Sequence, residues 1–205
     1  MGNRLLEYGA PFVLLQMAKY MADRVRRHGR DLDLVEVFSG KGELSKSFAE
    51  AGCKVASYEI QQNPKMCDLA SDVGLLHAVG LVPLPKLLGQ LSCSPVDFCC
   101  RALGKGMGWG TAGEVMRLKV GGLLWGGVPC SSWVFLNRHT SKRSREAPLG
   151  DEEQPAVRRA NLLVTRWTLL VLLAVSRGCL WLAEQPMSSL MPEHPRLKQV
   201  CELGQ

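Results

Sequence analysis

The sequence predicts an α/β protein with a doubly wound, mostly parallel sheet and helices on both faces, and three observations lead to this fold class. Strand-like apolar runs alternate with helical patterns along the chain, which indicates parallel strands. Three of these runs end in short motifs, namely Ser39-Gly40-Lys41-Gly42, Pro129-Cys130 and Glu184-Gln185-Pro186. Open α/β sheets bind their ligands at the carboxyl ends of the strands, so the three motifs mark one candidate site.

Length and composition fit one domain with an extension. The chain has 205 residues, of which 46% are hydrophobic and 21% charged, as in ordinary globular proteins. We divide it into an N-terminal helical extension, 1–33, and a main domain, 34–205. Apolar spacing and breaking glycines predict the elements in order: helix 12–27, strand 34–38, helix 43–51, strand 54–60, helix 73–79, strand 122–128, loop 131–153, helix 156–176 and strand 179–183.

The segment 81–119 interrupts this order. It is rich in proline and glycine, holds three clustered cysteines and shows neither the strand period nor the helix period. We expect an irregular insertion outside the sheet, since long segments without periodicity rarely belong to a compact core. The alternative is a lid over the ligand site, in which Met107 and Trp109 would pack against the sheet.

Charge and cysteine usage favour some functional classes over others. The net charge of +6 suits nucleic acid, but a moderately basic enzyme surface explains it equally well. The eight cysteines form no C-x-x-C pair, so we expect reduced thiols, no structural metal and a nuclear or cytoplasmic protein that is not secreted. The most apolar run, 162–175, contains Arg166 and is too short for a membrane span.

The first motif has the features of a nucleotide turn. Gly40 and Gly42 follow a strand and precede a helix, where glycine allows a sharp turn close to a ligand. Glu59 ends the next strand nineteen residues after Gly40 (59 − 40 = 19), close to the spacing at which an acidic side chain meets a ribose diol. A turn that needs glycine for structural reasons alone would give the same two glycines.

Together the motifs resemble those of the cytosine-C5 DNA methyltransferases. The segment 36–45, which includes Phe38-Ser39-Gly40-Lys41-Gly42, is similar to the first motif of that family, and Glu59-Ile60, Asp68-Leu69, Pro129-Cys130 and Glu184 follow in the family's order. The resemblance implies a Rossmann-like methyltransferase sheet, here truncated, and S-adenosylmethionine as cofactor. It implies cofactor contacts from Phe38, Ser39, Gly40, Gly42, Leu44, Glu59, Ile60, Asp68, Leu69 and Pro129.

The resemblance also assigns catalytic roles. Cys130 corresponds to the thiol that adds to carbon 6 of cytosine, and Glu184 to the carboxyl group that contacts ring nitrogen 3. The following basic segment would bind substrate, with DNA favoured over RNA, through Ser131, Arg138, Lys142, Arg143 and Arg145. A purely structural role remains possible for each group: Cys130 as a buried small side chain, Glu184 as the cap of a turn, and the basic segment as a solvated loop.

The sequence also departs from the family pattern. Val128 replaces a proline, Ser131 a glutamine and Gln185-Pro186 an Asn-Val pair, and no Gln-x-Arg-x-Arg motif follows Glu184. Nineteen residues follow Pro186 (205 − 186 = 19), which leaves no room there for a target-recognition region. Two alternatives therefore stay open: a methyltransferase acting on another substrate, and an inactive relic of the fold that binds cofactor or nucleic acid.

Overall fold

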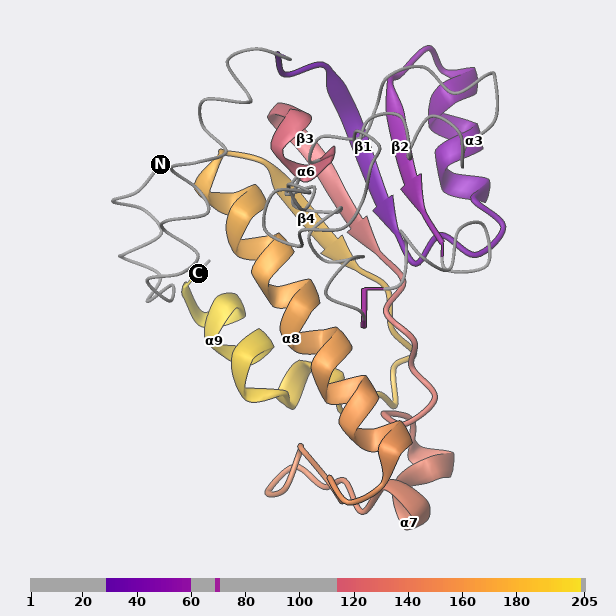
Figure 1. The fold of residues 1–205 in the computed structure, drawn as a ribbon, viewed down its shortest axis with the longest axis vertical. Coiled ribbons are helices and arrows are strands. Elements are labelled where there is room, and N and C mark those ends of the chain that lie inside the picture. The colour runs from indigo at the N-terminus through magenta and orange to yellow at the C-terminus, as the bar shows by residue number, and fades with distance from the viewer. Residues whose placement is uncertain (1–28, 60–68, 71–113, 204–205) are drawn as a thin grey trace, which may run out of the picture.

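A computed structural model describes residues 29–59, 69–70 and 114–203 (Figure 1). The predicted helices at 12–27 and 73–79, and the part of the expected insertion at 81–113, lie outside these residues. Along the described chain the strands are β1 (Leu32–Val37), β2 (Val55–Tyr58), β3 (Leu118–Gly126) and β4 (Leu180–Ala183), and the main helices are α3 (Glu43–Glu50), α8 (Pro155–Ser176) and α9 (Pro195–Leu203).

The four strands form one all-parallel sheet in the order β2-β1-β3-β4. The predicted α/β fold with a parallel sheet is therefore confirmed. β1 lies in the middle of the order, and its last residue, Val37, pairs with Tyr58 of β2 on one side and with Gly126 of β3 on the other. Gly126 in turn pairs with Ala183 of β4, so all four strands end at the same level of the sheet.

Helix α8 covers one face of the sheet (Figure 1). Val35 and Val37 of β1, with Leu124 of β3, are fully buried against its apolar side. Gly126 lets the ring of the buried Trp167 of α8 lie close to the backbone of β3, because a Cβ atom built on Gly126 would lie 2.6 Å from that ring. By length and composition α8 could cross a membrane, but 72% of its most apolar window is buried inside the protein, as in a core helix.

Helix α3 contacts β1 and β2 and covers the opposite face. Alternation along β1 turns Leu34 and Glu36 toward this face, because their neighbours Val35 and Val37 point toward α8. The buried Glu36 carboxylate accepts hydrogen bonds from the backbone N–H and the hydroxyl of Ser45. Leu180 and Leu182 of β4 are 64% and 52% exposed, so α3 leaves the β4 end of its face open among the described residues.

Several predicted boundaries were wrong, including the start of the main domain at residue 34, because β1 begins at Leu32. Residues 114–119, assigned to the insertion, form helix α6 (Glu114–Arg117) and the start of β3. Val115, Met116 and Leu118 are almost completely buried, so this part belongs to the core. The pairing of β1 with β3 shifts register between Leu32 and Leu34, which leaves extra residues, including Gly121, in β3. These extra residues interrupt the alternation of apolar and polar side chains by which a strand is recognised in sequence.

The region 131–153 is also more regular than the predicted loop. It contains a 3-10 turn, η2 (Phe135–Asn137), and a single helical turn, α7 (Arg138–Ser141). Two further elements follow β4 that the sequence had not indicated, namely η3 (Met191–Glu193) and α9. Leu197 and Val200 of α9 are buried against α8, but these short apolar spacings are too weak to predict a helix alone.

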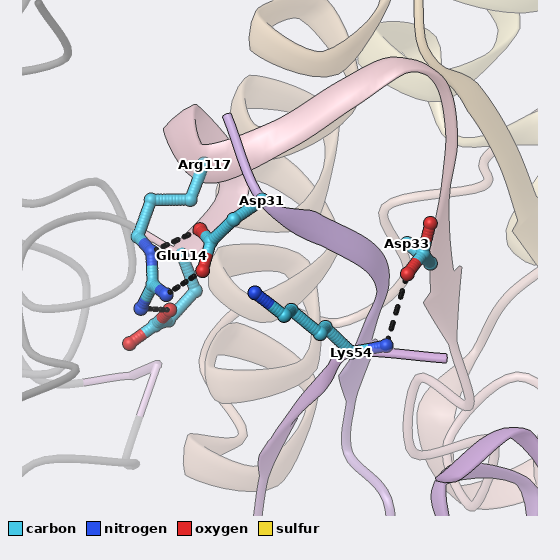
Figure 2. A network of polar contacts seen from close by, with 5 residues as sticks. All are labelled: Asp31, Asp33, Lys54, Glu114 and Arg117. Atoms are coloured by element: carbon cyan, nitrogen blue, oxygen red, sulfur yellow. Dashed lines mark hydrogen bonds and ion pairs between the residues drawn. The ribbon is translucent and has the colours of Figure 1, made fainter. Parts of the chain in front are cut away.

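Charged side chains tie together the amino ends of the strands (Figure 2). Arg117 of α6 donates two hydrogen bonds to the Asp31 carboxylate, from Nε at 2.9 Å and from Nη2 at 2.7 Å. Its Nη1 donates a third to the Glu114 carboxylate at 3.0 Å. Asp33 accepts from the backbone N–H of Lys54 at 2.9 Å and from Nζ of Lys119 at 2.8 Å. These contacts fasten α6, β1 and β3 to one another where the strands begin.

Candidate active site

The predicted motifs meet at the carboxyl edge of the sheet. Hydrogen bonds extend the ladder one step past the strand ends: the N–H of Ser39 donates to Tyr58 O at 3.1 Å, that of Gly127 to Val37 O at 3.1 Å, and that of Glu184 to Gly126 O at 2.9 Å. The glycine turn, the Pro-Cys segment and the glutamate therefore follow adjacent strands. This is the place where parallel sheets bind ligands.

The turn after β1 has the backbone conformation that requires glycine. Gly40 and Gly42 have φ values of 54° and 68°, in the left-handed region that other residues avoid. Phe38 shares this conformation at 60°, which is uncommon for a bulky residue and often found at functional sites. A Cβ built on Gly40 would meet no atom within 4 Å, so the glycine serves the turn itself and leaves open space beside it.

Glu59 is joined to this turn. Its side chain is buried, with the residue 9% exposed, and Oε2 accepts a hydrogen bond from the N–H of Gly40 at 2.8 Å. The hydroxyl of Ser57 donates to that of Ser39 at 2.7 Å in a second link between the same segments. Ser57 of β2 was not predicted, and only its place shortly before Glu59 in the sequence could have suggested it. The spacing of nineteen residues thus corresponds to a real contact.

The other predicted cofactor residues fall into three groups. Phe38 and Leu44 are half-buried beside the turn, and Pro129 is exposed after β3. Leu69 is 1% exposed within the hydrophobic core, and its carbonyl accepts a hydrogen bond from Nη1 of Arg166 at 2.8 Å. Its side chain is therefore committed to packing. Ile60 and Asp68 lie outside the described residues.

Cys130 begins a tight turn after β3. Its thiol is free and the residue is half-buried, and its carbonyl accepts from the N–H groups of Trp133 at 2.8 Å and Val134 at 3.2 Å. The neighbouring segment after β4 is tied to it, because the side-chain amide of Gln185 donates to Val128 O. Gln185 was predicted only as a departure from the family pattern, and the structure gives it a positioning role.

Glu184 differs from Glu59 in its surroundings. Its backbone continues the ladder, but the residue is exposed and its carboxylate has no partner among the described residues. A side chain without such contacts keeps its rotamer freedom, so a bound substrate would have to order it. The structure brings the Glu184 backbone to the edge that also carries Cys130 and leaves its carboxylate unrestrained.

One of the predicted substrate contacts was wrong. Arg143 is 3% exposed, and its guanidinium lies 3.4 Å from the centre of the Trp133 ring and donates to Ser132 and Pro148. Burial lowers the pKa of Arg143 to about 10. This arginine holds the loop together, and a phosphate could not reach it. The sequence showed only one more cation in a basic run.

The remaining basic-loop residues stay accessible. Ser131, Lys142 and Arg145 are exposed. Arg138 is half-buried, because it donates to Ser188 O at 3.2 Å and its guanidinium lies 5.1 Å from the centre of the Phe135 ring. Exposed cations in the loop that follows the Pro-Cys segment remain candidates for nucleic-acid contact.

Comparisons with known proteins add no relative: no family model, curated protein or solved structure matches the chain. Within 29–59, 69–70 and 114–203, no three histidine, cysteine or acidic side chains gather as metal ligands would. Any functional conclusion therefore depends on the geometry of the carboxyl edge.

Proposed function

We propose that this chain is an S-adenosylmethionine-dependent methyltransferase that acts on carbon 5 of cytosine in a nucleic acid. One observation carries the proposal: the glycine turn with its buried acid, and the Pro-Cys segment, follow adjacent strands of a parallel sheet at the same edge. The sequence resemblance concerns the same motifs, which supports the proposal.

The turn suits the proposed cofactor. The cofactor's ribose carries two hydroxyl donors, and a carboxylate such as that of Glu59, which accepts a hydrogen bond from the N–H of Gly40, is an acceptor suited to hydroxyl groups. The open space beside Gly40 allows close approach to the backbone. When bound, the cofactor would supply an electrophilic methyl group.

The residues of this chain would prepare cytosine to accept that group. The Cys130 thiolate forms a bond to carbon 6, and the electron pair released to carbon 5 takes up the methyl group. The Glu184 carboxyl group, hydrogen-bonded to ring nitrogen 3, stabilises the charge that develops on the ring. Loss of the carbon 5 proton to water then expels the thiolate and restores the aromatic ring. A base in a duplex would have to leave the stack first.

Covalent trapping tests this proposal. An oligonucleotide with 5-fluorocytosine should give a cofactor-dependent adduct that survives denaturation, since fluorine at carbon 5 prevents the final elimination. Cys130→Ala should abolish the adduct, and Cys53→Ala, which removes another half-buried free thiol, should leave it unchanged. An adduct that persists in Cys130→Ala would overturn the assignment of the nucleophile.

A binding module without activity is the second candidate, and the unrestrained Glu184 favours it. In that case calorimetry would show cofactor binding that depends on Glu59, but no DNA or RNA would give an adduct. A labelled-methyl assay across DNA, RNA and protein would separate this outcome from methyl transfer to another substrate.

A further inference from the structure

The glycine turn has the outline of the phosphate-binding turns of dinucleotide sites. It joins a parallel strand, β1, to the helix α3, and Glu59 follows the next strand and contacts the turn. In dinucleotide folds the same arrangement places a pyrophosphate on the first turn of the helix, because unpaired N–H groups and the helix dipole attract an anion. Acceptance of a phosphate by this turn therefore depends on which groups already occupy its N–H donors.

A carboxylate of the protein itself lies at the first turn of α3. Gly42 precedes the helix and has no side chain with which to cap it. Oε2 of Glu36 takes this role, because it accepts hydrogen bonds from the N–H of Ser45 at 3.0 Å and from the Ser45 hydroxyl. Ser45 is the third residue of the helix, and its N–H is one of those that a capping side chain normally accepts. Strand β1 thus supplies the negative charge that a phosphate supplies in dinucleotide sites.

Ser45 stands where dinucleotide turns have their third glycine. In the pattern G-x-G-x-x-G that glycine lets the helix pack closely against the strand, whereas this chain has Gly40, Gly42 and Ser45 at the three positions. Ser45 is 7% exposed and Glu36 is 4% exposed. The pair is therefore part of the packing between α3 and β1, and a ligand cannot displace the Glu36 carboxylate without breaking that packing.

Glu59 adds a second buried acid to the same turn. It accepts a hydrogen bond from the N–H of Gly40, so the carboxylates of Glu59 and Glu36 hold N–H groups before and after Gly42. Residues 38–45 include one cation, the exposed Lys41. A phosphate monoester carries a charge of about −1.5 to −2 at pH 7. At this turn it would lie near two negative groups that solvent screens little, because both are buried.

We propose that Glu36 makes the glycine turn select a nucleoside that carries no 5′-phosphate. This selectivity rests on the proposed function, because it assumes a nucleoside at Glu59, but it does not need methyl transfer. A ribose bound at Glu59 brings its 5′ substituent close to the turn, since Glu59 is itself bonded to Gly40. A neutral or cationic substituent, such as the sulfonium of S-adenosylmethionine, meets the two acids there without repulsion. The phosphates of nicotinamide and flavin dinucleotides meet like charge.

Calorimetry with adenosine and with adenosine 5′-monophosphate tests this selectivity in the full chain. We expect the wild-type protein to bind adenosine on the order of tenfold more tightly than the monophosphate. Glu36→Gln removes the charge and keeps an acceptor for Ser45, so the ratio of the two affinities should fall toward one. Glu43→Gln is the matched control, because it removes a charge from the first turn of α3 at a side chain that is 72% exposed. It should change the ratio by less than about twofold.

The ratio separates selectivity from a structural role, since a weakened fold lowers both affinities together. Equal binding of the two compounds to the wild-type protein would contradict the proposal, and this measurement needs no variant to fold. An unchanged ratio in Glu36→Gln, or an equal change in Glu43→Gln, would remove the role of Glu36.

The same experiment distinguishes this selectivity from the proposed methyl transfer. If neither compound binds, the nucleoside site at Glu59 is wrong and the selectivity is wrong with it. If adenosine binds selectively and the selectivity depends on Glu36, but no adduct forms with 5-fluorocytosine, the selectivity holds and methyl transfer to cytosine is overturned.

Discussion

The two edges of the sheet use charged side chains in opposite ways. At the amino edge, Asp31, Glu114 and Arg117 satisfy one another, and Arg117 retains 18% side-chain exposure and Glu114 only 7% (Figure 2). At the carboxyl edge, Glu184 is exposed without a partner among the described residues, and Cys130 is a half-buried free thiol. The same four strands begin at one edge and end at the other, so the difference comes from the side chains and not from the topology.

We interpret this difference as a separation of stability from the proposed function. A largely buried ion network fixes the position of the elements that form it, and removing one member leaves a charge without its partner. Groups that must contact a ligand cannot be satisfied by the protein alone. Glu59 lies between these extremes, since it is buried at the carboxyl edge and holds the Gly40 turn. We therefore expect amino-edge variants to alter the free energy of unfolding, and carboxyl-edge variants to alter binding and chemistry.

The largest expected effect is at Arg117. Arg117→Met removes three hydrogen bonds and leaves Glu114 and Asp31 together, so we expect the free energy of unfolding to fall by about 3–4 kcal/mol. Denaturant melts should show this, and cofactor affinity of the folded variant should not change. Lys119→Met breaks the more exposed pair with Asp33 and should cost less than about 1 kcal/mol. Equal losses in the two variants would contradict the special role of the buried network.

A pH series tests the same network next. Burial raises the pKa of Glu114 to about 7 from an ordinary 4.5, so the folded protein binds more protons than the unfolded chain between these values, and stability falls as pH rises. Burial lowers the pKa of His194 from 6.5 to about 4. Between these pH values the unfolded chain binds more protons at this residue than the folded protein, so the contribution of His194 to stability rises with pH.

The two contributions oppose each other in the wild-type protein, and single variants should separate them. Relative to wild type, Glu114→Gln should gain on the order of 3 kcal/mol as pH rises from 4.5 to 7. His194→Gln should lose stability relative to wild type between pH 4 and 6.5. Denaturant melts at each pH measure both differences, and parallel stability curves for the three proteins would show that neither group is perturbed.

Arg143 and Lys142 give the sharpest comparison within one loop. Arg143→Met removes the buried cation from Trp133 and from several carbonyl groups, and it should lower the free energy of unfolding by about 2 kcal/mol. Lys142→Met, at an exposed neighbour, should stay within about 0.5 kcal/mol. Oligonucleotide binding should follow the reverse order, measured by fluorescence anisotropy. A stable Arg143→Met variant that fails to bind DNA would restore Arg143 as a contact residue.

Glu59 should affect binding more than stability. Glu59→Ala loses the hydrogen bond to Gly40 and should cost about 1 kcal/mol in stability, but on the order of tenfold or more in S-adenosylmethionine affinity. Glu59→Gln keeps an acceptor for Gly40 and should recover much of the stability. Glu43→Ala, which removes an exposed acid of α3, is the control for calorimetry. Unchanged affinity in Glu59→Ala would remove the ribose role.

Cys130 should show the smallest change in stability. Cys130→Ala removes a half-buried sulfur with no bond to lose, so the free energy of unfolding should shift by less than about 1 kcal/mol. Adduct formation with 5-fluorocytosine should nevertheless disappear. A large loss of stability would indicate that the thiol packs as a structural residue, contrary to the contrast between the two edges.

The sequence by itself determined the parallel sheet and the glycine turn, and it singled out Glu59 by its spacing from Gly40, whereas the hydrogen bond between the two came from the structure. Apolar runs of strand length, separated by helical patterns, are local signals that tertiary contacts seldom reverse. Cys130 and Glu184 could be placed at the ends of strands for the same reason. The positive φ values of Gly40 and Gly42 follow from the need to turn sharply between a strand and a helix.

Only the tertiary structure decided which polar residues were available. Arg143 and Lys142 look alike in sequence, and one is buried on Trp133 while the other faces solvent. Likewise, α6 and α9 are too short or too weakly patterned to predict, and they form because Val115, Met116, Leu197 and Val200 find apolar surface supplied by distant segments. Burial depends on contacts between residues far apart in the chain, and local patterns carry no information about those contacts.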